Sequence, residues 1–313
     1  MQFPATKDST VMKIGLLDVD GHNFPNFALL KIAGYYKQVG GVKYEMVMPF
    51  EEYDKVFASK VFTFTEDFNP YEINAKEIIK GGTGYDIKSK LPNEIEKSTV
   101  MDYSIYPKYN FSLQRFSDGC IRNCPFCLVR EKEGYIKPVE PVELNPRSEY
   151  IYVLDNNFFA NPEWRSAVKY LQEKKQPVML SGVDVRIMDE EHAYALNTLK
   201  LKSGVHIAWD LPKIDLTERL QAMVKHVKAW KITCYVLVGF NSTLEEDLSR
   251  IYTLRRLGIK PFVQPYRDYE NKRKPKQYEK DLARWANRSW LLKSTDFEDY
   301  SPRKGFKCGS YLK

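Results

Sequence analysis

Apolar residues in the second half of the chain follow two alternating patterns. Short apolar runs, which are typical of buried strands, cover residues 111–116, 150–154, 178–182, 205–209, 232–238 and 261–264. Segments with helical spacing separate most of them, at residues 162–174, 189–199, 216–230 and 244–257. Strands that alternate with crossover helices predict an α/β fold with a parallel sheet. Because eight such units close a TIM barrel, these six predict a partial parallel (β/α)6 TIM-like barrel with ligands at the carboxyl ends of its strands.

The first 84 residues predict a smaller α/β unit in front of this barrel. Strand-like runs at 11–20, 43–48 and 55–64 alternate with helix-like segments at 24–39 and 71–80. The second helix would end at a glycine-rich turn, residues 81–84. This order predicts a small Rossmann-like domain. The chain then divides into this domain at 1–84, a linker at 85–110, the barrel at 111–265 and a C-terminal extension at 266–313.

Composition places the chain among soluble folded proteins. The sequence has 313 residues, of which 43% are hydrophobic and 28% charged, which is too apolar for a disordered chain. No run approaches the roughly 20 apolar residues of a membrane span, and the first residues lack the layout of a secretory signal. Five cysteines are too few for a disulfide framework in a chain of this length. We therefore expect a cytoplasmic protein without a membrane partner.

Positive charge is concentrated at the C-terminal end. The net charge is +7, and residues 266–313 hold 13 Lys and Arg against seven Asp and Glu, which leaves +6 there. Basic residues among aromatic ones can attract phosphate and stack on bases, so nucleic acid is one partner class to consider. Helical spacing of Leu282, Trp285 and Trp290 instead favours a helix that covers the open edge of the barrel with both tryptophans. That interpretation leaves only the basic run 272–276 exposed and favours a small-molecule or peptide substrate.

Three of the five cysteines lie within eight residues, directly after the first strand of the predicted barrel. They are Cys120, Cys124 and Cys127, whereas Cys234 and Cys308 are isolated in the sequence. Thiolates are the soft ligands that iron–sulfur clusters prefer. Three thiolates can hold three irons of a [4Fe–4S] cluster and leave the fourth iron open to another molecule. A structural zinc ion would need a fourth ligand, for which Cys308 is the best candidate.

The spacing Cys-x3-Cys-x2-Cys, with the aromatic Phe126 before the last cysteine, resembles the signature loop of the radical S-adenosylmethionine superfamily. The resemblance implies that Cys120, Cys124 and Cys127 bind a [4Fe–4S] cluster whose open iron binds S-adenosyl-L-methionine. It further implies that an electron from a reductant such as flavodoxin or ferredoxin splits this cofactor. The resulting 5'-deoxyadenosyl radical takes a hydrogen atom from a substrate that the sequence does not identify. No residue that acts directly on the substrate can be named.

The resemblance also implies contacts with the cofactor from the cysteine loop and from the end of the second strand. Phe126 would contact the adenine through its backbone. The family usually carries a Gly-Gly-Glu triplet after the second strand, to hold the methionine amino group. Here the sequence reads Asp155, Asn156 and Asn157, which departs from the triplet but still offers polar acceptors. Asp155 and Asn156 are therefore the candidates, with an ordinary helix N-cap as the alternative role for Asp155.

Later strand ends supply the remaining candidates. Arg186 would pair with the methionine carboxylate, because its guanidinium matches a carboxylate in shape and charge. Asp184 would accept from the ribose hydroxyls, and Asp210 would contact either the ribose or the amino group. Val238 and Gly239 lie on the strand that is similar to the adenine-contacting strand of the family. Alternative interpretations make Asp210 an N-cap and Arg186 a surface residue.

The N-terminal domain resembles the cobalamin-binding domain found in one branch of this superfamily. Asp20 and His22 have the Asp-x-His spacing of the cobalt-binding motif, but Pro25 stands where the motif has glycine. The partial match favours a degenerate scaffold domain over cobalamin binding. Two further functions remain as alternatives to the radical enzyme. One is a cobalamin-dependent radical methyltransferase, and the other is a non-enzymatic iron–sulfur or zinc protein that only binds partners.

Overall fold

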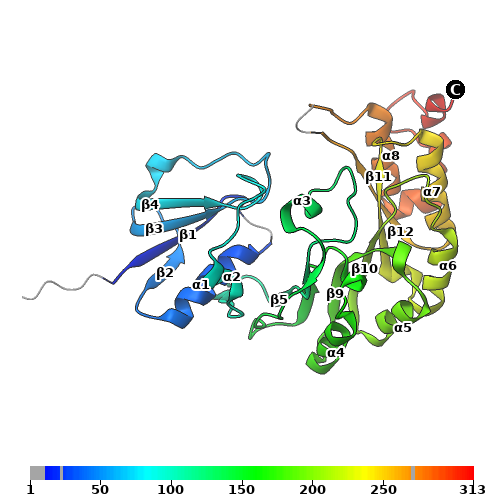
Figure 1. Cartoon of the computed structure of the whole chain (residues 1–313). Helices are drawn as coiled ribbons and strands as arrows, with labels where there is room; N and C mark the ends of the chain where they lie inside the picture. Colours follow the sequence, from blue (N-terminus) through cyan, green and yellow to red (C-terminus); the bar gives the residue numbers. More distant parts are fainter. Residues whose placement is uncertain (1–10, 22–23, 269–271) are drawn as a thin grey trace, which may run out of the picture. The chain divides into compact units, whose positions relative to one another are not determined.

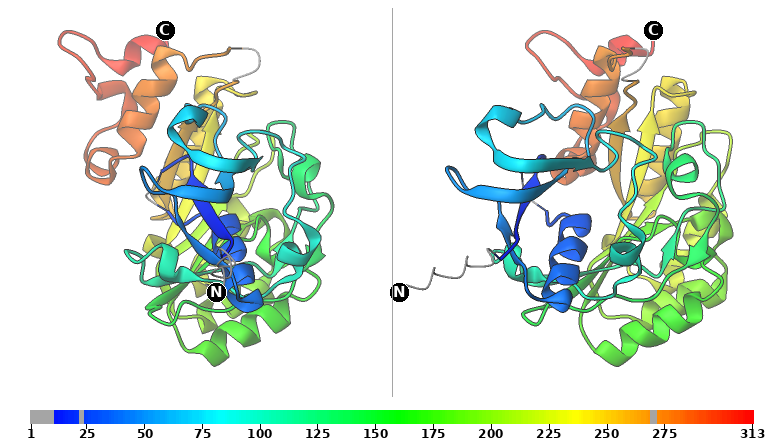
Figure 2. Two further views of the ribbon diagram at one scale, coloured as in Figure 1. Left: turned by 90° about the vertical axis from the view of Figure 1, so that its left-hand side faces the viewer. Right: turned by 60° about the vertical axis from the view of Figure 1, so that its left-hand side comes forward.

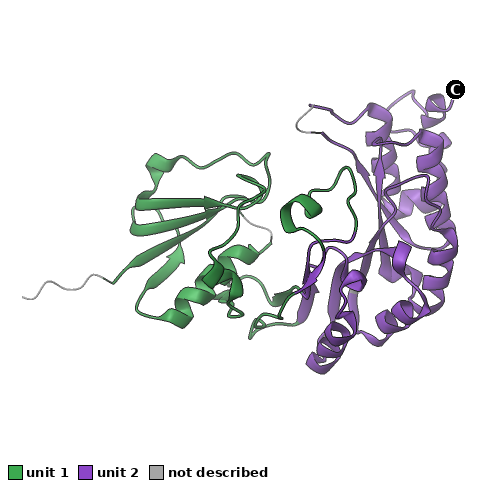
Figure 3. Ribbon diagram, viewed as in Figure 1, with its two compact units in different colours: residues 1–115, 122–135, 139–149 green, residues 116–121, 136–138, 150–313 purple. Residues whose placement is uncertain are grey.

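The computed structural model describes residues 11–21, 24–268 and 272–313. The chain divides into two compact units, shown in Figure 3. Unit 1 comprises residues 1–115, 122–135 and 139–149, and unit 2 comprises residues 116–121, 136–138 and 150–313. The four predicted segments thus reduce to two units, and the C-terminal extension 266–313 belongs to unit 2.

Unit 1 contains a four-stranded parallel sheet. Its strands are β1 (Lys13–Asp18), β2 (Lys43–Met46), β3 (Glu52–Ser59) and β4 (Asn74–Gly81), in the order β2-β1-β3-β4. All three neighbouring pairs are parallel. The first strand lies inside the sheet, with β2 on one side of it and β3 and β4 on the other. This strand order is typical of doubly wound α/β units. The sequence prediction of a small parallel α/β unit is confirmed at this level.

Helix α1 (Phe27–Val39) packs on one face of this sheet (Figures 1 and 2). The helix begins three residues later than the sequence pattern predicts, because the Asn26 side chain accepts hydrogen bonds from the backbone N–H groups of Ala28 and Leu29. Its buried side chains join the core of the unit. The core cluster consists of Ile14, Leu16, Leu29, Ile32, Ala33, Phe57 and Ile95.

The helix predicted at residues 71–80 is wrong. Residues 74–81 form strand β4 instead, preceded by a short 3-10 helix at Pro70–Glu72. In β4, Ile78 and Ile79 pair in register with Val56 and Phe57 of β3. Two adjacent β-branched residues favour a strand, and the free backbone groups of β3 provide the partner that the sequence pattern does not show.

The predicted linker at 85–110 is also corrected. This segment contains helix α2 (Asn93–Lys97) and a 3-10 helix at Tyr103–Ile105. Ile95, Met101 and Tyr103 are at most 4% exposed. A segment that contributes buried apolar side chains to unit 1 is part of its core and not a connector.

A six-stranded sheet follows the order that the sequence predicts. Its strands are β5 (Phe111–Gln114), β8 (Tyr150–Val153), β9 (Val178–Val183), β10 (Leu201–Ala208), β11 (Ile232–Val238) and β12 (Lys260–Pro265). They are arranged as β12-β11-β10-β9-β8-β5, so that strands consecutive in this series are also neighbours. The four pairs from β8 to β12 are parallel. The structure therefore confirms a parallel α/β sheet.

Four crossover helices cover one face of this sheet, as Figure 1 shows for unit 2. They are α4 (Trp164–Lys174), α5 (Glu190–Thr198), α6 (Thr217–His226) and α7 (Leu244–Arg256). The sequence Thr243-Leu244-Glu245-Glu246 predicts a capping box at the start of α7, and the structure confirms it, since the side chains of Thr243 and Glu246 accept each other's backbone N–H. The pattern Asp215-Leu216-Thr217-Glu218 predicts a second box for α6, which is wrong: the N-cap is Leu216, and the Asp215 carboxylate accepts the Thr217 backbone N–H.

The C-terminal segment forms two helices, α8 (Gln277–Ala286) and α9 (Ser289–Ser294), and not one. Helix α8 packs on β12, an end strand of the sheet. Trp285 is fully buried, as predicted, but Trp290 is 67% exposed, so the prediction that both tryptophans are covered is wrong for Trp290. Asn287 follows α8 and pairs with both backbone groups of Val263, so it satisfies part of the free edge of β12.

The basic run 272–276 is only partly the exposed surface that was expected. Lys272, Lys274 and Lys276 are exposed, but Arg273 is partly buried. Its guanidinium lies 2.6 Å from the carboxylate of Glu279, which is fully buried. A charge used to neutralise a buried carboxylate is structural and does not contribute to a free basic surface. Within the described residues, no helix is long and apolar enough to cross a membrane.

Candidate functional site

The cysteine loop is bracketed by a short antiparallel pair of strands. Strand β6 (Ser117–Asp118) pairs with β7 (Lys137–Pro138), and the loop runs between them and includes α3 (Val129–Glu133). Cys120 and Cys124 are partly buried, Cys127 is exposed, and all three are free thiols. The Cys127 backbone N–H donates to the Cys124 carbonyl at 3.0 Å, which closes a turn around Phe126. Phe126 itself is partly exposed.

The loop carries the right donor atoms but no assembled metal site. Among residues 11–21, 24–268 and 272–313, no group of three or more His, Cys, Asp or Glu side chains is arranged to hold a metal ion. The chemistry of the donors fits an iron–sulfur cluster, because the loop carries three cysteines whose thiolates are soft ligands.

The two other cysteines do not share this accessibility. Cys234 and Cys308 are each fully buried. Burial raises the pKa of Cys308 to about 11 and raises that of Cys234 as well. The position of Cys308 between Lys307 and Gly309 in the sequence predicts an exposed residue, and this prediction is wrong. A buried thiol with a raised pKa is a poor source of thiolate, so Cys308 is a poor fourth ligand for zinc.

Asp155 is an anchor for the start of the cysteine loop. Its carboxylate accepts from the Phe116 backbone N–H at 3.0 Å and from the Ser117 hydroxyl at 2.6 Å. The residue is 1% exposed. Each carboxylate oxygen thus accepts one hydrogen bond from the start of the loop, and contact with a ligand amino group stays a prediction. Asn156, the next residue, is exposed.

We expect Asp155→Ala to destabilise unit 2. The substitution leaves the Phe116 N–H and the Ser117 hydroxyl buried without their acceptor, at a cost of about 1–3 kcal/mol for a buried unsatisfied group. Urea unfolding of the wild type and the variant measures the difference. The control is Asp299→Ala, which removes an ion pair with Lys307 whose side chains are 69% and 65% exposed, worth about 0–1 kcal/mol. Equal losses in the two variants would contradict the anchoring role.

Asp184 and Arg186 form a close pair after β9. The guanidinium contacts the two carboxylate oxygens at 2.7 and 3.0 Å. The same carboxylate accepts the Arg186 backbone N–H at 3.1 Å. The structure thus brings together two residues for which we expected separate contacts, the ribose hydroxyls for Asp184 and a ligand carboxylate for Arg186. A ligand carboxylate would have to compete with Asp184 for the same guanidinium.

Asn157 is a site residue that we did not select from the sequence. Its side-chain amide donates to Cys120 Sγ at 3.8 Å and to Asp184 Oδ2 at 3.4 Å, both within unit 2. The amide therefore joins the first cysteine of the loop to the pair formed by Asp184 and Arg186. Its place in the polar triplet after the second strand was the available signal, but the sequence does not show which member of the triplet turns inward.

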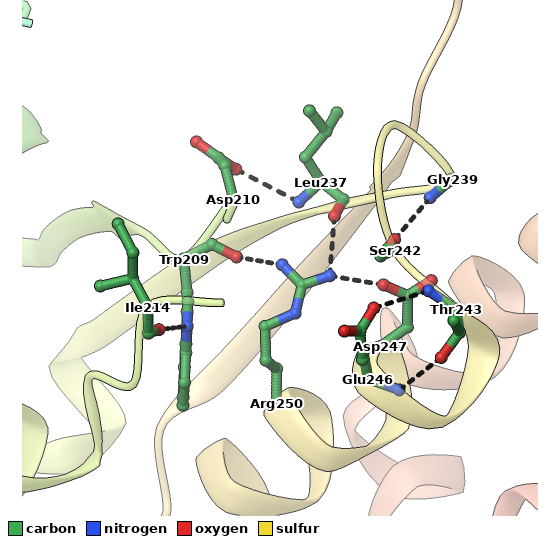
Figure 4. A network of polar contacts seen from close by, with 10 residues as sticks. All are labelled: Trp209, Asp210, Ile214, Leu237, Gly239, Ser242, Thr243, Glu246, Asp247 and Arg250. Atoms are coloured by element: carbon green, nitrogen blue, oxygen red, sulfur yellow. Dashed lines mark hydrogen bonds and ion pairs between the residues drawn. The ribbon is translucent and has the colours of Figure 1, made fainter. Parts of the chain in front are cut away.

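The ends of β10 and β11 are tied together by hydrogen bonds, as Figure 4 shows. Asp210 accepts the Leu237 backbone N–H at 3.2 Å, and burial raises the pKa of Asp210. Val238 is fully buried, so any contact with a ligand would have to come from its backbone. Gly239 has a φ of +75°, and a Cβ there would lie 2.2 Å from the Glu279 carboxylate. Only glycine fits this turn.

Arg250 of α7 connects the ends of β10 and β11 through further hydrogen bonds (Figure 4). Its guanidinium donates to the backbone carbonyls of Trp209 and Leu237 and pairs with Asp247 at 2.5 Å. Arg250 is 2% exposed and Asp247 is fully buried. Sequence reasoning did not identify Arg250, because the apolar spacing of α7 does not show that its buried face also carries Asp247 and Arg250.

The cobalamin-like features of unit 1 have local structural partners. Asp20 accepts from the Val61 and Phe62 backbone N–H groups and from the Thr65 hydroxyl. His22 lies outside the described residues. Gly82 has a φ of +97°, and a Cβ there would lie 2.3 Å from the carbonyl oxygen of Lys60. The glycine of this turn is thus required for close packing inside the unit.

The sequence matches no protein-family model and no curated protein.

Proposed function

We propose that the protein is a radical S-adenosylmethionine enzyme. The observation that carries the proposal is the set of three cysteines at Cys-x3-Cys-x2-Cys spacing on one loop, none of them fully buried, while both remaining cysteines are fully buried. The loop precedes a series of parallel strands joined by crossover helices, and ligands of such sheets bind at the carboxyl ends of the strands. The candidate residues Asp184, Asp210 and Gly239 follow the carboxyl ends of β9, β10 and β11.

In this proposal Cys120, Cys124 and Cys127 hold a [4Fe–4S] cluster. When bound, that group supplies reductive cleavage of S-adenosyl-L-methionine and hence a 5'-deoxyadenosyl radical for hydrogen abstraction. The chain's own residues position the cofactor. Arg186 binds its carboxylate in competition with Asp184, and Asp210 offers a carboxylate at the end of β10. Flavodoxin or ferredoxin is the proposed reductant, and we propose a cytoplasmic enzyme with a small-molecule or peptide substrate.

Contacts in the structure weigh against the alternatives. The burial of Cys308 weakens a zinc site with four cysteines. The packing requirement at Gly82 accounts for the glycine-rich turn without cobalamin, which favours a scaffold role for unit 1. Arg273 and Arg303 pair with the buried carboxylates of Glu279 and Asp281, which leaves less free positive charge for a nucleic acid.

The test is anaerobic reconstitution with iron and sulfide, followed by reduction in the presence of S-adenosyl-L-methionine. We expect a brown protein with about four iron atoms per chain. We also expect slow formation of 5'-deoxyadenosine even without substrate, because the cofactor site is built from the chain itself. Protein that is replete with iron and reduced, yet forms no 5'-deoxyadenosine with or without cell extract, would overturn the proposal. Tight binding of one zinc ion and no iron would favour the non-enzymatic alternative.

A further inference from the structure

Asn157 combines deep burial with an unusual set of contacts. The residue is 1% exposed and lies between β8 and a short 3-10 helix at Phe158–Ala160. Its amide nitrogen is within hydrogen-bonding distance of Cys120 Sγ and of Asp184 Oδ2. Its Oδ1 atom is buried and has no hydrogen-bond partner among the described residues. The amide thus directs donors at two acceptors while its own acceptor is unsatisfied.

This arrangement lowers the stability of the fold if Asn157 has only a packing role. A buried polar atom without a partner loses its hydrogen bonds to water and gains none, and a leucine of similar volume would avoid that loss. The two acceptors are both groups that carry negative charge in the proposed site: a ligand thiolate and the Asp184 carboxylate. Hydrogen bonds to charged acceptors are about twice as strong as neutral ones. The position therefore favours a donor, and it places that donor beside the first metal ligand.

We propose that Asn157 is a positioning residue that orients the Cys120 thiolate and raises the reduction potential of the cluster held there. The inference rests on the proposed function. An N–H group directed at a ligand sulfur stabilises the more electron-rich, reduced form of an iron–sulfur centre, and such partners also fix the orientation of the ligand. The Asp184 carboxylate accepts a hydrogen bond from the same amide nitrogen. Asn157 therefore also links the proposed cluster ligand Cys120 to the ion pair of Asp184 and Arg186.

The test measures the midpoint potential of reconstituted, full-length protein by a redox titration followed with electron paramagnetic resonance. Asn157→Leu removes both donors and keeps the side-chain size, and Asn157→Asp keeps the shape but carries no N–H when ionised. The hydrogen bond stabilises the more electron-rich reduced cluster more than the oxidised one, so its loss disfavours reduction. We therefore expect the ratio of reduced to oxidised cluster at a fixed potential to fall about tenfold, which is about 59 mV for one electron. Asn197→Leu, an exposed amide on α5, should leave the potential unchanged.

The possible outcomes separate this inference from the proposed function. If wild-type protein takes up no iron, the proposed function fails and the inference fails with it. If both Asn157 variants bind the cluster at the wild-type potential, only the inference is overturned. Selective loss of iron from a variant that retains its circular dichroism and urea midpoint supports the positioning of Cys120. Loss of the fold in both variants would make Asn157 a purely structural residue and would overturn the inference.

Discussion

Replacing any one of Cys120, Cys124 and Cys127 with Ala is expected to remove most of the bound iron and to abolish 5'-deoxyadenosine formation. Substitution of a residue that only supports a metal ligand typically lowers metal affinity or activity 10- to 100-fold. Loss of a ligand itself should exceed that range. The structure sharpens this expectation, because both remaining cysteines are fully buried and neither can substitute for a missing ligand.

The matched control for this prediction is Cys308→Ala. It removes a thiol of the same chemistry that is fully buried and whose pKa burial raises to about 11. We expect this variant to retain its iron and its cofactor cleavage, with at most a modest loss of stability from the small cavity. Iron content and 5'-deoxyadenosine, measured side by side on all four variants, decide the matter. Loss of most of the iron from Cys308→Ala would show that the ligand set has been assigned wrongly.

The parts of the fold that could be predicted are those in which local pattern and tertiary structure agree. Strand β11 is rich in apolar and β-branched residues, and its alternate residues from Ile232 to Val238 are fully buried. Helix α7 has both an apolar face and a capping box at Thr243, so its start was correctly placed. In such elements the sequence itself shows the structure: apolar residues repeat with the period of the buried face, and capping residues stand at the helix terminus.

The errors arose where a tertiary partner decides the structure. Residues 74–81 carry apolar side chains that suit a helix as well as a strand, and only the edge of β3 selects the strand. Tyr103 and Tyr106 follow no periodic pattern, so nothing in the sequence distinguishes these buried aromatic residues from a tyrosine-rich linker. Periodicity detects regular elements that pack against a flat core, and irregular segments escape it.

The candidate site divides in the same way. The cysteine motif is local and could be found from spacing alone. Which oxygen or nitrogen each polar residue contacts depends on elements far apart in the chain, as for Asp155, whose partners lie 38 and 39 residues before it. The contact between Asn157 and Cys120 spans 37 residues. A sequence can therefore place polar residues at strand ends, but it cannot say which face the ligand and which support the fold.

Arg250→Met is expected to lower the free energy of unfolding of unit 2 by about 3–5 kcal/mol, the usual cost of removing one partner of a buried ion pair. The substitution keeps much of the apolar volume but removes the donors to the Trp209 and Leu237 carbonyls and to the Asp247 carboxylate. Arg255→Met is the control on the same helix, since its partner Asp296 is 61% exposed. That change should cost only about 0–1 kcal/mol.

The loss in Arg250→Met should also depend on pH, with a sign that identifies Asp247 as the cause. Burial raises the pKa of Asp247 to about 6 even beside Arg250, and without the guanidinium it should rise further. The folded variant then binds more protons than the unfolded chain, whose Asp titrates near 3.9, so its stability falls as the pH rises through and above 6. Urea unfolding at pH 5 and pH 8 should therefore show the larger loss at pH 8. Adding Asp247→Asn should remove that difference, and a small, pH-independent loss in Arg250→Met would mean that this network does not hold the ends of β10 and β11 together.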